Sequence, residues 1–115
     1  MKILWLAKHP PQDVFLKALR DKFGNVAVIR DVSLSQSLEE IVRRARAKDH
    51  DETVLVGTFP MSFLVQIAEC GVRPLIADLR PVPHKDQSHI EENGKFFRFV
   101  RFRRLTGVSL DFEEV

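Results

Sequence analysis

The chain has 115 residues, of which 44% are hydrophobic, and its 18 basic and 16 acidic side chains leave a net charge of only +2. This size and apolar content predict one globular domain and exclude a disordered tail or a pair of domains, while the balanced charge does not by itself demand nucleic acid. One cysteine excludes an internal disulfide, and the sequence has no signal peptide and no bilayer-spanning apolar run, so we expect a cytoplasmic protein with no membrane partner.

Strands and helices alternate over residues 1–80. Short apolar runs predict strands at 2–7, 26–29, 53–56 and 73–79, and helical spacing of apolar residues predicts helices at 11–23, 35–50 and 59–70. Gly24 is placed to end the first helix, and Ser37 with Glu40 fits the capping box of the second. Such alternation favours a parallel sheet covered by helices, as in a small Rossmann-like domain.

The last third of the chain departs from this pattern. Residues 81–94 are polar and predict a long loop, of a length typical of lids or mobile connections. Residues 95–103 and 108–112 predict the two strands of a β-hairpin within 95–115, added to the sheet or to a partner subunit. The predicted fold is therefore α/β, a single Rossmann-like domain with a βα core at 1–80, a loop at 81–94 and a C-terminal antiparallel hairpin at 95–115.

Ligands of open parallel sheets collect beyond the carboxyl ends of the strands. The candidate ligand-binding residues at those ends are Lys8, His9, Asp31, Ser33, Gly57, Thr58, Phe59, Asp78 and Arg80. These cations, hydroxyls and backbone amides suit a phosphodiester or nucleotide. No pair of carboxylates, histidines or thiolates stands at metal-ligand spacing on a regular element, so neither a metal nor another cofactor is expected.

The turn within Val54–Pro60 is the strongest indication of a ligand site, because a buried strand runs directly into the start of a helix. Unpaired N–H groups at a helix start attract anions, phosphates above all. Gly57 lets a ligand approach the backbone, Thr58 can cap the helix through its hydroxyl, and Pro60 suits a first helical turn. The alternative is that this turn serves geometry alone, since no Walker lysine or GxGxxG run accompanies it.

The strand at 95–103 interleaves phenylalanines with arginines, a pattern found on surfaces that bind single-stranded nucleic acid. A structural role ranks above that one, because apolar residues occur on both faces of the expected strand. The arginines would then reach the rim or pair with Asp111, Glu113 and Glu114. The basic run Arg43, Arg44, Arg46 and Lys48 is interpreted as the solvated face of the second helix.

Several short segments together resemble a known family. They are Lys8-His9-Pro10, Val56-Gly57-Thr58-Phe59-Pro60, Ala68-Glu69-Cys70-Gly71 and Leu75–Leu79, and they resemble the small stand-alone CRISPR-associated Rossmann-like (CARF-related) proteins of the ring nuclease type. The resemblance covers about residues 1–80. It implies binding of cyclic oligoadenylate, with cyclic tetra-adenylate as the first candidate, and cleavage that switches off antiviral signalling.

The resemblance also suggests a metal-independent mechanism. The ribose 2′-hydroxyl would attack the neighbouring phosphorus, so the protein needs to orient the phosphodiester and stabilise its charge. Lys8, His9 and Thr58 are the catalytic candidates, with His9 as acid or base, and a symmetric homodimer would match a ring with twofold symmetry. Two alternatives stay open: a binding protein that sequesters the ring uncut, and a nucleic-acid or protein adaptor that uses the Phe/Arg hairpin.

Overall fold

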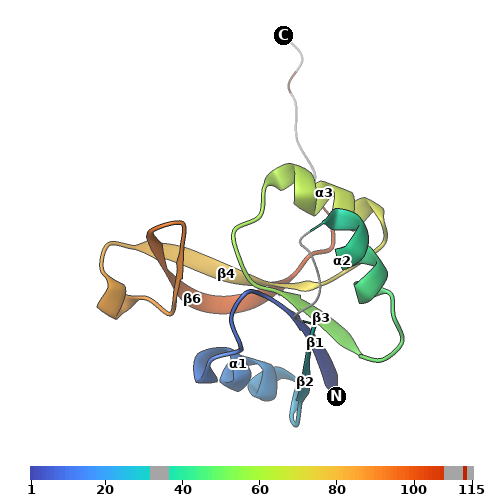
Figure 1. Ribbon diagram of the computed structural model, residues 1–115, viewed down its shortest axis with the longest axis horizontal. Helices are drawn as coiled ribbons and strands as arrows, with labels where there is room; N and C mark the ends of the chain where they lie inside the picture. The colour runs from blue at the N-terminus through green and yellow to red at the C-terminus, as the bar shows by residue number, and fades with distance from the viewer. Residues whose placement is uncertain (32–36, 108–112, 114–115) are drawn as a thin grey trace.

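The structure is a computed structural model that describes residues 1–31, 37–107 and 113 (Figure 1). Its elements alternate as the sequence predicts as far as the fourth strand. In chain order they are β1 (Lys2–Leu6), α1 (Asp13–Phe23), β2 (Ala27–Arg30), α2 (Leu38–Ala45), β3 (Glu52–Leu55), α3 (Met61–Glu69), β4 (Leu75–Val82), the 3₁₀ turn η1 (Lys85–Gln87), β5 (Ile90–Glu92) and β6 (Lys95–Arg104).

The described strands form one mixed sheet in the order β2-β1-β3-β4-β6-β5. β1 pairs in parallel with both β2 and β3, and β3 pairs in parallel with β4. β6 then pairs antiparallel with β4 and with β5. The α/β class is confirmed, but the sheet is parallel over four strands only, since a short turn, not a crossover helix, joins β5 to β6.

Helices cover both faces of the sheet: α1 lies on one side, and α2 and α3 lie on the other (Figure 1). The core under α1 is built around Trp5, Phe15 and Val54, and the core under α2 and α3 around Leu4 and Ile67. The alternating residues of β1 thus enter two cores. This explains why the residues of β1 after the exposed Lys2 form an unbroken apolar run.

Residues 81–94 are not one long loop, which corrects the prediction. β4 continues to Val82, and β5 lies within this segment. Asn93 and Gly94 have φ values of 52° and 75°, the left-handed conformation that both central residues of a type I′ hairpin turn need. The hairpin of the C-terminal third is therefore β5–β6, and the second strand predicted at 108–112 lies outside the described residues.

A β-bulge decides which face each β6 side chain occupies. The β4–β6 register shifts between Asp78 and Leu79, so that Asp78 lies opposite Arg101 and Leu79 opposite Phe99. Phe99 and Phe102 therefore reach the same face although they are three residues apart, and their ring centroids are 4.8 Å from each other. Beside the bulge, the backbone N–H of Phe99 donates to His89 Nδ1 at 2.8 Å.

The helix ends are partly as predicted. The Gly24 N–H donates to Arg20 O at 2.8 Å beyond α1, and Ser37 Oγ accepts from Glu40 N at 3.3 Å before α2. α3 begins at Met61 with Pro60 as its N-cap, so the predicted capping of this helix by Thr58 is wrong. Within the described part of the chain, no helix has the length and apolar character to cross a membrane.

Candidate functional site

A cavity of about 520 Å³ opens at the carboxyl ends of β1, β2 and β3, beside the start of α3. The chain leaves β1 toward α1 on one face and leaves β3 toward α3 on the other, so the two connections diverge between these neighbouring strands. That divergence is where ligands of open α/β sheets bind. The lining residues are Leu6, Ala7, Lys8, Arg30, Asp31, Ile41, Leu55, Val56, Gly57, Thr58, Phe59, Pro60, Phe63, Glu92 and Asn93.

One acidic side chain already occupies the turn between β3 and α3. The backbone N–H and the hydroxyl of Thr58 both donate to Glu92 Oε2, each at 3.0 Å. Glu92 comes from β5, 34 residues further along the chain, and is half-buried. Two donors thus converge on one anionic oxygen, which is the arrangement that binds a carboxylate or a phosphate.

Gly57 makes this close approach compatible with the backbone. Its φ of 153° is strained for any residue with a side chain. A Cβ at this position would lie 3.2 Å from Glu92 Oε1 and 3.5 Å from the ring of Phe59. The glycine therefore provides both the turn and the space for an anion above it.

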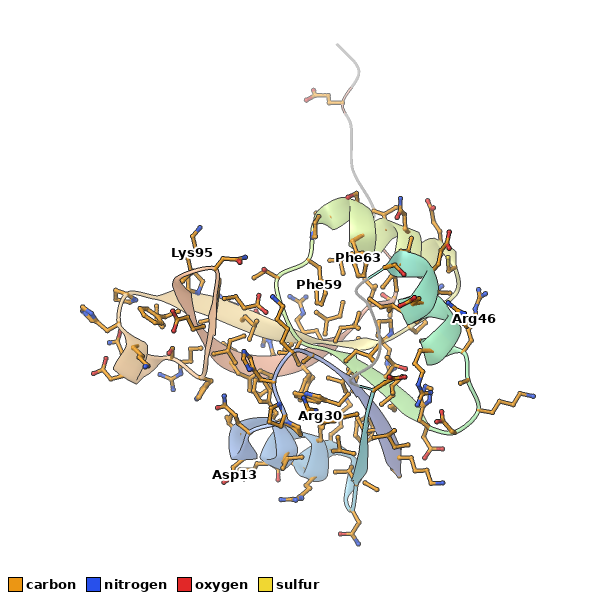
Figure 2. All side chains as sticks on the ribbon, in the orientation of Figure 1. Asp13, Arg30, Arg46, Phe59, Phe63 and Lys95 are labelled. Carbon is orange, nitrogen blue, oxygen red and sulfur yellow. The ribbon has the colours of Figure 1, made fainter. Side chains whose placement is uncertain are left out.

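The wall of the cavity beside this turn is aromatic and aliphatic. The rings of Phe59 and Phe63 stack, with centroids 5.3 Å apart and planes 12° from parallel. Figure 2 shows the two side chains together between α3 and the sheet, and both are half-buried. A largely apolar wall with a few polar groups beside it is the usual composition of a small-molecule site.

Two cations border the cavity, Lys8 after β1 and Arg30 at the end of β2, and both are exposed. The acidic Asp31 beside them is ion-paired, since Arg44 Nε lies 3.0 Å from Asp31 Oδ2. Arg44 also binds both carboxylate oxygens of Asp49, at 2.7 and 2.8 Å. These bonds, those with Asp49 first, raise the pKa of Arg44, so the guanidinium that holds Asp31 stays charged.

The structure brings together five of the predicted site residues, all of which line the cavity: Lys8, Asp31, Gly57, Thr58 and Phe59. His9 does not line it. It borders an adjoining hollow of about 10 Å³, which shares Lys8 and Glu92 with the main cavity. The turn that carries Lys8 and His9 is held to the core, because Trp5 Nε1 donates to His9 O at 2.8 Å.

Two other predicted residues, Asp78 and Arg80, do not line the cavity. β4 does not end at Leu79, so Asp78 and Arg80 lie inside a paired strand rather than beyond it. They bind each other, with Arg80 Nε 3.2 Å from Asp78 Oδ1. Ser33 lies outside the described residues.

No known protein family, curated protein or solved structure matches this chain. Within the described ranges, no group of three or more His, Cys, Asp or Glu side chains is gathered in a way that could hold a metal ion.

Sequence reasoning missed Arg30, Phe63 and Glu92 as cavity residues. The aromatic pair at positions 59 and 63 has the spacing of neighbours on one helix face, so Phe63 was open to prediction. The Asn93-Gly94 dipeptide was a hairpin signal that would have placed Glu92 at a strand end. Its contact with Thr58, in contrast, depends on the curl of the whole sheet and leaves no local signal.

Proposed function

We propose that this cavity binds a nucleotide phosphodiester, with a phosphate oxygen on the Gly57-Thr58 turn. The observation that carries the proposal is the pair of donors of Thr58, which already hold the anionic oxygen of Glu92 at 3.0 Å. A phosphate oxygen carries negative charge and accepts the same bonds. The ligand would displace Glu92, and Lys8 and Arg30 would lie close enough to the phosphate to offset its charge.

The apolar wall supports a nucleotide over a free phosphate. The stacked rings of Phe59 and Phe63 offer a surface against which a base packs, and the volume of about 520 Å³ lies within the range of small-ligand sites. Cyclic tetra-adenylate is the ligand to test first, because the segments that resemble ring nucleases include both Lys8 and the Gly57-Thr58 turn. A ring of that size would span the cavities of two copies related by a twofold axis.

We further propose that the protein cleaves the bound ring. The attacking 2′-hydroxyl belongs to the ligand, so the protein would contribute charge stabilisation by Lys8 and by the two donors of Thr58. His9 borders the adjoining hollow and not the cavity. Its predicted role as acid or base is therefore tested by replacing His9 and Lys8 in separate variants. A non-cleaving protein would bind the ring through the same residues and release no product.

The experiment is a titration of the protein with labelled cyclic tetra-adenylate in EDTA, with retention and product size read from the same samples. The decisive variant is Thr58→Val, which removes the hydroxyl and keeps the side-chain shape. Because Glu92 accepts the same bond in the free protein, Thr58→Val is compared in the Glu92→Ala background. There the loss of one bond to a charged acceptor weakens binding about tenfold. Thr106→Val, on an exposed residue after β6, is the matched control and keeps full affinity. Equal affinity of both variants would refute the phosphate position, and no binding of the ring or of inorganic phosphate by the unchanged protein would refute the proposal.

A further inference from the structure

The antiparallel pairing of β4 with β6 places four arginines on one face of the sheet. Residues directly opposite each other in a ladder point to the same face, and Arg101 lies opposite Asp78 while Arg98 lies opposite Arg80. Arg103 lies opposite Ile76, which packs in the core under α2 and α3. We call the four residues around Asp78 the arginine face: Arg80, Arg98, Arg101 and Arg103.

The bulge in β6 makes this face polar. It moves Phe99 and Phe102 together onto the α1 side, where both rings pack against Phe15 with centroids 4.6 and 6.2 Å away. The expectation that apolar residues occupy both faces of this strand was the reason for ranking nucleic acid below a structural role. That reason fails for the stretch around the bulge, because its aromatic rings lie on the buried face and its arginines on the outer face.

The arginine face is open and carries an excess of positive charge. The side chains of Arg80 and Arg101 are 59% and 60% exposed, and both lie against the one carboxylate of Asp78, at 3.2 and 3.5 Å. The hydrogen bond from Arg80, followed by the charges of Arg101 and Arg103, holds the pKa of Asp78 below its usual range, so the carboxylate stays ionised. Glu91 lies opposite Phe96 and thus on the same face, so two carboxylates stand against four guanidinium groups. Figure 1 shows that β4 and β6 extend beyond α3 here, so neither α2 nor α3 covers their outer ends.

The geometry of the arginine face suits an extended nucleic acid strand. Alternate residues on a strand repeat about every 6.8 Å and neighbouring strands lie about 4.8 Å apart, so the guanidinium groups form a short double row. Each guanidinium group can donate two parallel hydrogen bonds to a phosphate. Phe96 lies opposite Val82 at the end of the same face and is half-buried, which leaves part of its ring for a base to stack on.

A single strand fits this surface better than a duplex does. The major groove admits a helix or a two-stranded ribbon, whereas a face made by strands within a wider sheet stays outside it. An acidic peptide would match the charge but makes no use of Phe96. We propose that the arginine face binds single-stranded nucleic acid through its phosphates, at a site separate from the cavity, since none of its four arginines lines that cavity.

The test is fluorescence anisotropy with a labelled oligouridylate of about 16 nucleotides. The double variant R101Q/R103Q removes two charges and leaves Arg80 to pair with Asp78. The matched control R20Q/R43Q removes two exposed charges from α1 and α2. We expect R101Q/R103Q to lose about tenfold in affinity at about 50 mM salt and the control less than about twofold, with binding by the unchanged protein falling steeply toward about 200 mM salt.

Four results would overturn the proposal: no binding by the unchanged protein, equal losses in both double variants, equal affinity for a duplex of the same length, or equal displacement by polyglutamate. The last would identify an acidic protein as the partner. The fluorescence of the buried Trp5 reports whether each variant is folded. R101Q/R103Q should bind cyclic tetra-adenylate as the unchanged protein does, because neither residue lines the cavity, so this proposal and the cavity proposal fail independently.

Discussion

Replacing Glu92 by alanine should tighten the binding of cyclic tetra-adenylate, because the carboxylate occupies the position proposed for the phosphate. Its Oε2 accepts two bonds of 3.0 Å from Thr58. A hydrogen bond to a charged group contributes about 1.5–3 kcal/mol, and the exposure of Thr58 places the whole contact at the lower end, about 1.5 kcal/mol. A ligand that no longer has to break this contact gains the same free energy, which corresponds to about tenfold in affinity.

Two measurements check this value independently. Calorimetric titration gives the change in affinity for cyclic tetra-adenylate, and urea unfolding followed by Trp5 fluorescence gives the stability that the ligand-free variant loses. Both should change by about 1.5 kcal/mol, in opposite senses. Glu91→Ala is the control, since Glu91 is the exposed neighbour on β5 and its replacement changes the charge equally. If Glu92→Ala bound the ring more weakly than the unchanged protein, or no more tightly than Glu91→Ala, Glu92 would not occupy the phosphate position.

Three further predictions concern the scaffold. Phe99→Ala should lower the free energy of unfolding, measured by urea unfolding, by about 3–5 kcal/mol. The reason is that Phe99 is 5% exposed and its ring centroid lies 4.6 Å from that of Phe15. A loss below about 1 kcal/mol would contradict the packing of β6 on α1. Gly57→Ala should cost about 1–3 kcal/mol in thermal unfolding, because the φ of 153° is strained for alanine, and an unchanged melting temperature would contradict this turn geometry. Hydrogen bonds, that from Arg44 first, hold the pKa of Asp49 below its usual value of 3.8, so its stabilising effect is complete above that pH and is lost as the pH falls below it. Asp49→Asn should accordingly lose less stability than the unchanged protein between about pH 5 and pH 2, and parallel acid profiles would exclude this contribution.

The order of elements over residues 1–80 could be predicted because their signals are local. The unbroken apolar run of β1 and the helical spacing of Phe15 and Leu19 each follow from one element packing on its neighbours. The parallel order of the first strands predicts that their carboxyl ends meet. Lys8 and Thr58 do line one cavity there, although they are 50 positions apart in the chain.

The C-terminal third could not be predicted in the same way. Alternation along β6 is interrupted by the bulge opposite Asp78 and Leu79, and a bulge shifts every later side chain to the other face without a clear mark in the sequence. The end of β4 was placed too early for a related reason. Proline is uncommon within a paired strand, yet Pro81 pairs with Phe97 as the strand continues to Val82.

The partners in the ion pairs could not be predicted from the sequence either, because they come from distant parts of the chain. Arg44 was interpreted as part of a solvated helix face, but its side chain is only 18% exposed and joins Asp31 to Asp49. Arg104 binds Glu52 through two nitrogens, at 2.7 and 2.9 Å, and thereby ties the end of β6 to the start of β3. Each partner is set by the tertiary fold, so sequence spacing alone could not assign it.

The most direct test of the proposed site is the nitrogen–proton NMR spectrum of the protein during titration with cyclic tetra-adenylate and, separately, with inorganic phosphate. We expect the amide signals of Gly57, Thr58 and Glu92 to shift together and saturate with both ligands, while that of Thr106 stays in place. Shifts confined to Arg98, Arg101 and Arg103, or no saturable shift at Thr58 with either ligand, would contradict the claim that the β3–α3 turn binds phosphate.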